Sequence, residues 1–130
     1  MIAKGEFSVE MKPLEPFAKA ADGMNVGRMS ITKTFGGDLL AKSTGEMLSA
    51  LTDVKGSAGY VAIEQVTGSL KGKTGSFMLQ HFGMMNRGES HLILEVVPDS
   101  GTGQLVNLAG KMDIIITHGT HFYEFEYSLD

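Results

Sequence analysis

The sequence contains no cysteine, which excludes disulfide bonds, thiol catalysis and thiolate metal sites. It also lacks any apolar run of about 18 residues, so no transmembrane helix is predicted. Its first residues alternate apolar and charged side chains, whereas an export signal needs a continuous apolar stretch. We therefore expect no membrane partner and a cytoplasmic location.

Positive charge is scarce as well. The net charge is −4 and no dense run of lysine and arginine occurs, which argues against nucleic acid as a partner. The length of 130 residues predicts one domain over residues 1–130, and 42% hydrophobic residues suffice for one core. The 17 glycines are spread between apolar stretches, as in all-β proteins with many turns.

Alternation of apolar and polar residues predicts about eight strands. They are expected at residues 2–11, 26–35, 39–51, 90–97 and in two hairpins, over 60–85 and 111–127. Short links favour an antiparallel up-and-down order, which most simply closes into an eight-stranded barrel. A two-sheet sandwich is the alternative.

The irregular segments give three further expectations. Residues 12–25 predict a loop with a short helical turn around 17–21, and residues 102–108 predict one short helical turn. Gly45 interrupts its strand and suggests a β-bulge there.

The hairpin over residues 60–85 carries the most informative pattern. A two-residue turn at Lys71-Gly72 would place Glu64 opposite Leu79 and Ala62 opposite His81. Glu64 and His81 then become diagonal neighbours on an inward, apolar face. The second hairpin, with its turn at His118-Gly119, separates an apolar from a charged face in the same way.

An acid and a histidine on an apolar face form either a small functional site or a buried structural pair. Glu64 and His81 are therefore the candidate catalytic residues, as general acid or base. Other inward side chains on these hairpins are candidates for a ligand-binding wall. They are Tyr60, Phe77, Leu79, His121, Tyr123 and Tyr127. A plain barrel core is the alternative for the aromatic ones.

No cofactor and no metal are expected. Glu64, His81 and His121 are suitable ligand types for zinc or iron, but the sequence has no close pair of histidines at ligand spacing. The run Ser100-Gly101-Thr102-Gly103 lacks the lysine of a phosphate-binding loop and is interpreted as a turn.

Three segments carry a family resemblance: GYVAIEQVTGSLKGKTGSFMLQHFGMM, VVPDSGTGQL and HFYEFEY. They resemble an uncharacterised bacterial family classed as a domain of unknown function, and the resemblance covers residues 59–129 best. It implies the closed eight-stranded barrel of plant allene oxide cyclase. That enzyme cyclises an apolar epoxide, and its activity would come to this chain by fold analogy alone.

Three functions remain open from the sequence. The favoured one is a barrel that binds a small apolar molecule, with Glu64 and His81 as polar anchors. The others are an isomerase or cyclase using the same residues, and a structural or assembly barrel filled by side chains. Apolar residues expected on the outer face, such as Ile115 and Phe122, favour a homo-oligomer.

Overall fold

A computed structural model describes all residues, 1–130, and contains eight β-strands with one short 3₁₀ helix. The strands are β1 (Ile2–Leu14), β2 (Asn25–Phe35), β3 (Leu39–Leu51), β4 (Ala58–Leu70), β5 (Lys73–Asn86), β6 (Glu89–Val96), β7 (Ala109–Thr117) and β8 (Thr120–Ser128). The 3₁₀ helix η1 (Gly103–Leu105) lies in the connection from β6 to β7. No helix is long and apolar enough to span a membrane.

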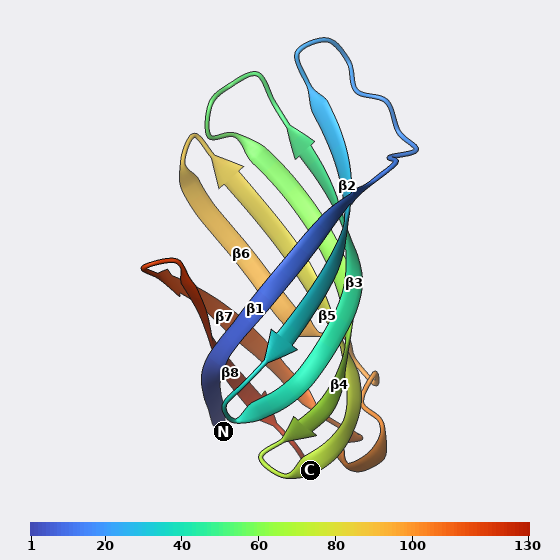
Figure 1. Ribbon diagram of the computed structural model, residues 1–130, viewed down its shortest axis with the longest axis vertical. Coiled ribbons are helices and arrows are strands. Elements are labelled where there is room, and N and C mark those ends of the chain that lie inside the picture. The colour runs from blue at the N-terminus through green and yellow to red at the C-terminus, as the bar shows by residue number, and fades with distance from the viewer.

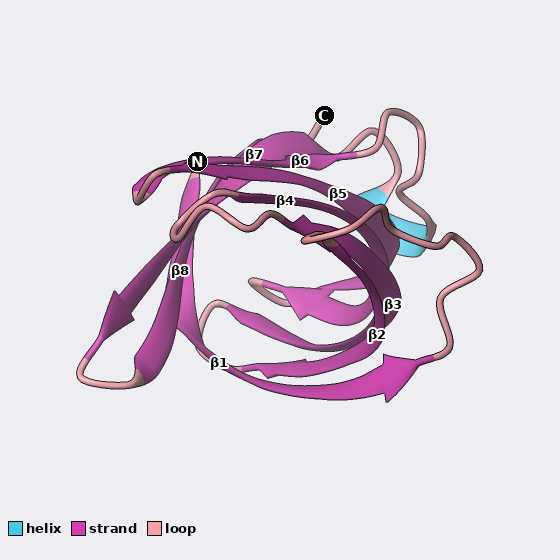
Figure 2. Ribbon diagram, turned by 90° about the horizontal axis from the view of Figure 1, so that it is seen from above, coloured by secondary structure: helices cyan, strands magenta, loops and turns pink.

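The strands pair antiparallel with their sequence neighbours, and β8 returns to pair with β1 (Figures 1 and 2). The predicted up-and-down eight-stranded barrel is therefore confirmed, and the sandwich alternative is wrong. Both hairpin registers are confirmed too: Glu64 lies opposite Leu79, and Ile114 lies opposite Tyr123. Positive φ angles at Gly72 and Gly119 allow the two tight turns.

Two local expectations are wrong. Residues 17–21 form bends and coil, with no helical turn, because two prolines and few local apolar contacts leave nothing to stabilise one. Gly45 forms no bulge, since β3 pairs without interruption with both β2 and β4. Strand β1 also runs three residues further than expected, through Pro13. There it pairs only with β2, and proline is tolerated on such an edge.

The barrel has two unlike halves. The filled half contains the turns at residues 36–38 and 71–72 and the helix η1, and its inward side chains are buried. They include Phe7, Phe35, Leu39, Leu70, Phe77, Leu79, Leu105, Tyr123, Phe125 and Tyr127. The rings of Phe77 and Phe125 stack at 5.9 Å, and those of Phe125 and Tyr127 at 5.2 Å. Burial of these side chains is the main source of stability in this fold.

The open half contains the connections at residues 15–24, 52–57 and 87–88. Its wall has a weak seam, because β6 and β7 are joined by one register pair, Glu95 with Lys111. Beyond that pair the tip of the β7–β8 hairpin diverges from β6, as Figures 1 and 2 show. Ile116, on the inward face of this hairpin, is consequently 64% exposed.

Candidate functional site

Four buried polar side chains meet in the middle of the barrel, where the filled half ends. They come from four adjacent strands and are Lys33, Ser43, Glu64 and His81. Glu64 is at the centre: its Oε1 accepts hydrogen bonds from Lys33 Nζ at 3.1 Å and His81 Nε2 at 3.2 Å. Its Oε2 accepts one from the Ser43 hydroxyl at 3.0 Å. We call these four residues the polar cluster.

The surroundings of Glu64 fix its charge. Burial alone would raise its pKa, but the hydrogen bond from His81 and the positive charge of Lys33 outweigh that effect. The pKa of Glu64 is therefore below its ordinary value, and the side chain is a carboxylate at neutral pH. The Lys33 ammonium is further stabilised by aromatic faces, since it lies 4.9 Å from the centre of the Phe7 ring.

The sequence positions Glu64 by leaving space beside it. A Cβ atom on Gly45, its neighbour on β3, would lie 2.7 Å from both Cα and Cβ of Glu64. Gly45 thus permits close approach of the two strands, which is the reason for a glycine where the sequence suggested a bulge.

Sequence reasoning identified Glu64 and His81 but missed Lys33 and Ser43. Lys33 continues the inward alternation of Met29, Ile31 and Phe35, so strict period-two counting in that strand would have found it. Ser43 depends on the register of β3, which the sequence did not determine.

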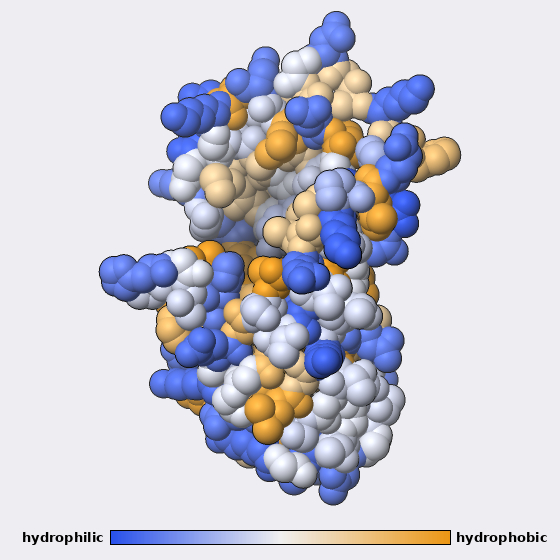
Figure 3. All heavy atoms as spheres, in the orientation of Figure 1, coloured by the Kyte–Doolittle hydropathy of each residue, from blue (hydrophilic) through white to orange (hydrophobic).

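Above the polar cluster, inward side chains are not covered by protein. Met11, Leu51 and Leu92 follow the inward alternation of their strands but are 49%, 52% and 38% exposed. Met47 and Tyr60 are half-buried. The space-filling view shows a hollow in this part of the molecule, rimmed by apolar residues (Figure 3). The open half is therefore an apolar chamber accessible to solvent, with the polar cluster at its base.

Two candidate wall residues border this chamber. The ring of Tyr60 lies 6.2 Å from that of His81 and covers Gly83, where an added Cβ would come within 2.1 Å of it. The Tyr60 hydroxyl forms no hydrogen bond within the protein; burial and the charge of Glu64 raise its pKa. His121 is half-buried and packs 5.2 Å from the Phe7 ring.

The other four wall candidates lie in the filled half. Phe77, Leu79 and Tyr127 are buried in its hydrophobic core. The Tyr123 hydroxyl donates to the Gly36 carbonyl at 2.6 Å and accepts from the Leu39 amide at 2.9 Å, which ties β8 to the β2–β3 turn. Burial raises its pKa, although the Leu39 bond opposes the rise. These contacts give the four residues packing roles.

The suggested metal ligands do not converge. No group of three or more histidine and acidic side chains is arranged to hold a metal ion. Glu64 and His81 are in contact, but the other group bound to that Glu64 oxygen is the amine of Lys33, which is no metal ligand here.

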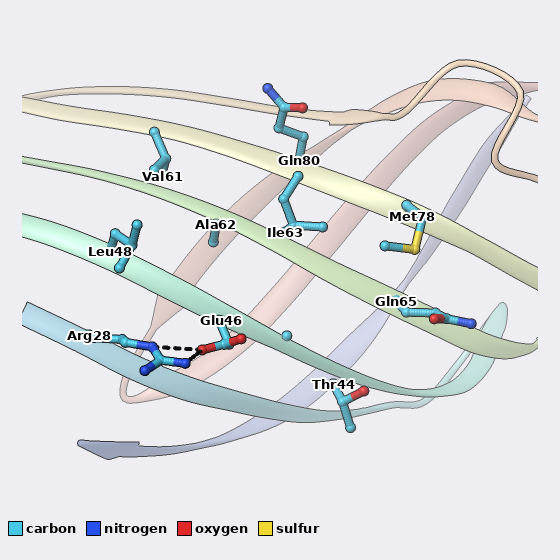
Figure 4. Close-up of a pocket in the computed structure, with 11 residues that line it drawn as sticks. Arg28, Thr44, Glu46, Leu48, Val61, Ala62, Ile63, Gln65, Met78 and Gln80 are labelled. Carbon is cyan, nitrogen blue, oxygen red and sulfur yellow. Dashed lines mark hydrogen bonds and ion pairs between the residues drawn. The ribbon is translucent and has the colours of Figure 1, made fainter. Parts of the chain in front are cut away.

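A second hollow lies on the outer surface of β2–β5, with a volume of about 830 Å³ (Figure 4). Leu48, Val61 and Ile63 form its apolar floor, and Arg28 lies at its edge, where its Nε donates to Glu46 at 2.8 Å. This groove is shallow and exposed, and none of its titratable groups is buried. It suits a contact surface better than a chemical site.

The groove is part of a longer apolar row. Strand pairing places Leu48, Val61, Phe82 and Ile93 side by side on the outer faces of β3, β4, β5 and β6. Each is between 41% and 51% exposed. We call these four residues the outer row.

Fold and site together define a class: a small, closed eight-stranded barrel with an apolar chamber at one end and an ionised polar cluster inside. The chain belongs to the family described as "Protein of unknown function (DUF3224)", whose profile matches residues 3–127. The expected membership of an uncharacterised bacterial family is thus confirmed, whereas the likeness to allene oxide cyclase stays a prediction.

A solved structure supports this assignment. The chain is similar to a protein of unknown function from the same family in Shewanella oneidensis MR-1, with 54% sequence identity and a TM-score of 0.97. The match covers 100% of this chain and 98% of that one. A search of curated proteins found no match.

Proposed function

We propose that the protein binds a small, largely apolar molecule in the open half of the barrel, above the polar cluster. The observation that carries this proposal is the exposure of inward side chains there, such as Met11 and Leu92. A barrel with a structural role alone would gain stability by filling that space, as the filled half does with aromatic rings. Concave, mostly apolar chambers with a few polar groups are typical ligand sites.

The polar cluster orients the bound ligand. Its charges are compensated within the protein, since Lys33 neutralises Glu64, so an uncharged ligand meets no unpaired ion. Tyr60 and His81 supply polar atoms at the chamber base, whereas Met29 and Met47 offer flexible apolar contacts that adapt to different shapes.

Titration with 4-nitroanisole, a neutral apolar probe, tests the proposal. Met47→Trp should fill the open half and weaken binding about tenfold or more. Met78→Trp is the matched control, because Met78 lines the outer groove. Thermal unfolding of both variants confirms that they fold. Equal affinity in the two variants, or no binding to the native protein, would count against the chamber as a ligand site.

Native mass spectrometry of freshly purified protein then looks for the natural ligand. An added mass that disappears on denaturation, and is absent from Met47→Trp but present in Met78→Trp, would be a molecule retained in the chamber. The same added mass in both variants would place it elsewhere.

We also propose that the protein forms a homodimer through the outer row. Four adjacent apolar side chains on an exposed sheet face are unusual unless a partner covers them. A twofold axis through the middle of the row lays the four apolar side chains of one copy against the same four of a second copy, which favours a second copy as the partner. Cell fractionation would test the accompanying prediction of a cytoplasmic location.

A further inference from the structure

The hydrogen bonds of the polar cluster leave one nitrogen of His81 unused. Its Nε2 contacts Oε1 of Glu64 at 3.2 Å, and its Nδ1 forms no hydrogen bond within the protein. A carboxylate can only accept, so Nε2 carries a proton in this contact. In the neutral imidazole, Nδ1 is then a lone-pair acceptor held at the base of the chamber, in a side chain only 4% exposed.

We propose that the ligand is a weak organic acid, an apolar body that carries one ionisable hydroxyl, and that the Glu64–His81 pair takes up its proton on binding. This inference rests on the proposed function, because it names the ligand class of that site. Nδ1 has no partner within the protein but is not fully buried, so a ligand that donates a hydrogen bond can reach it, whereas a pure hydrocarbon would displace water from Nδ1 without replacing its hydrogen bond.

On binding, one proton moves from the ligand hydroxyl to Nδ1 of His81. The ligand O–H bond breaks, its electron pair stays on the oxygen, and the proton forms an N–H bond with Nδ1. The resulting imidazolium keeps its hydrogen bond to the Glu64 carboxylate, which stabilises the new positive charge as in other carboxylate–histidine pairs. The chamber then holds an anion beside a cation, and the total charge is unchanged.

The groups around His81 fit this arrangement. Tyr60 has a free hydroxyl and remains protonated, so it can donate to the ligand oxyanion. Lys33 donates to the same Glu64 oxygen as His81, so its positive charge favours an anion in the chamber and opposes a full positive charge on His81. The residue paired with His81 on β6 is Leu94, which is apolar, so no second acid competes for the proton.

The test uses 4-nitrophenol, whose phenolate absorbs at longer wavelength than the phenol, with 4-nitroanisole as the neutral control. An apolar chamber alone would favour the neutral phenol, and the pH at which bound 4-nitrophenol is half ionised would rise. The proposed pair should favour bound phenolate, lowering the midpoint by about one pH unit, equivalent to a tenfold preference.

Two variants identify the groups responsible. His81→Gln keeps a donor to Glu64 but removes the base, so the preference for 4-nitrophenol over 4-nitroanisole and the phenolate absorption should both fall. Tyr60→Phe should retain proton uptake and raise the midpoint by less than His81→Gln does. Equal behaviour of His81→Gln and the native protein would overturn the role of His81.

The outcomes separate the two proposals. Binding of 4-nitroanisole together with bound 4-nitrophenol in its neutral form, or with no binding of 4-nitrophenol, overturns the weak-acid inference and leaves the chamber as a ligand site. Binding of neither compound overturns both. Binding of 4-nitroanisole together with phenolate binding that depends on His81 supports both.

Discussion

Oε1 of Glu64 accepts hydrogen bonds from both Lys33, at 3.1 Å, and His81, at 3.2 Å. A single buried carboxylate oxygen therefore links the amine of Lys33 to the imidazole ring of His81. Because of Lys33, the stability of a Glu64→Gln variant does not report on ligand binding alone. Glutamine at position 64 would leave a buried ammonium without its counter-ion, so a loss of stability there does not distinguish a binding barrel from a structural one.

Lys33→Met should lower the free energy of unfolding by about 3 kcal/mol, because it leaves a buried carboxylate without its cation. The double variant Lys33→Met/Glu64→Gln should recover much of that loss, since no buried charge remains. Urea denaturation of the native protein, both single variants and the double variant gives the coupling energy. Strictly additive losses would show that the two side chains do not interact.

Acidification should destabilise the protein through Glu64. Its folded-state pKa is lowered, so the stabilisation is fully present above the ordinary glutamate value of about 4.3 and is lost as the pH falls through the folded-state pKa. Below pH 4.3 the native protein should therefore lose stability more steeply than Lys33→Met/Glu64→Gln, by up to about 1.4 kcal/mol per pH unit. Parallel curves of unfolding free energy against pH would contradict an ionised Glu64.

Gly45→Ala should destabilise the protein by about 1–3 kcal/mol, because the new methyl group would lie 2.7 Å from Glu64 and 2.2 Å from the Ile63 carbonyl oxygen. Gly59→Ala is the matched control on the neighbouring strand, where the nearest atom is the Met84 sulfur at an ordinary 3.6 Å. Chemical denaturation compares the two. A tolerated alanine at position 45 would mean that the strands separate without cost.

Val61→Glu should convert the proposed dimer into monomers, because Val61 is central in the outer row. Leu40→Glu is the control: Leu40 also points outward from β3 and is 60% exposed, but it lies outside the row. Analytical ultracentrifugation measures the mass. A native protein that sediments as a monomer would refute the dimer.

The sequence predicted the barrel because its hairpins contain strong local signals. The turns at Lys71-Gly72 and His118-Gly119 determined register, and register alone placed Glu64 beside His81. The same reasoning could not show that β3 brings Ser43 to Glu64, because Gly45 looked like a bulge and the register of that strand was open.

The difference between the two halves of the barrel was not predictable from alternation. Phe77 and Met47 both occupy inward positions, yet one is buried in stacked rings and the other faces a chamber. Which inward residues are covered depends on the single pairing of β6 with β7 and on the divergence of the β7–β8 hairpin. Those are properties of tertiary packing that period-two patterns do not encode.

Methionine methyl NMR during titration with 4-nitroanisole tests the central claim most directly, because methionines mark three regions of the molecule. Met29 and Met47 face the chamber, Met112 is in the filled half, and Met78 lines the outer groove. We predict saturable shifts of the Met29 and Met47 methyl signals, with Met112 and Met78 unchanged. Shifts confined to Met78, or no shift at Met29 and Met47, would contradict a ligand site inside the barrel.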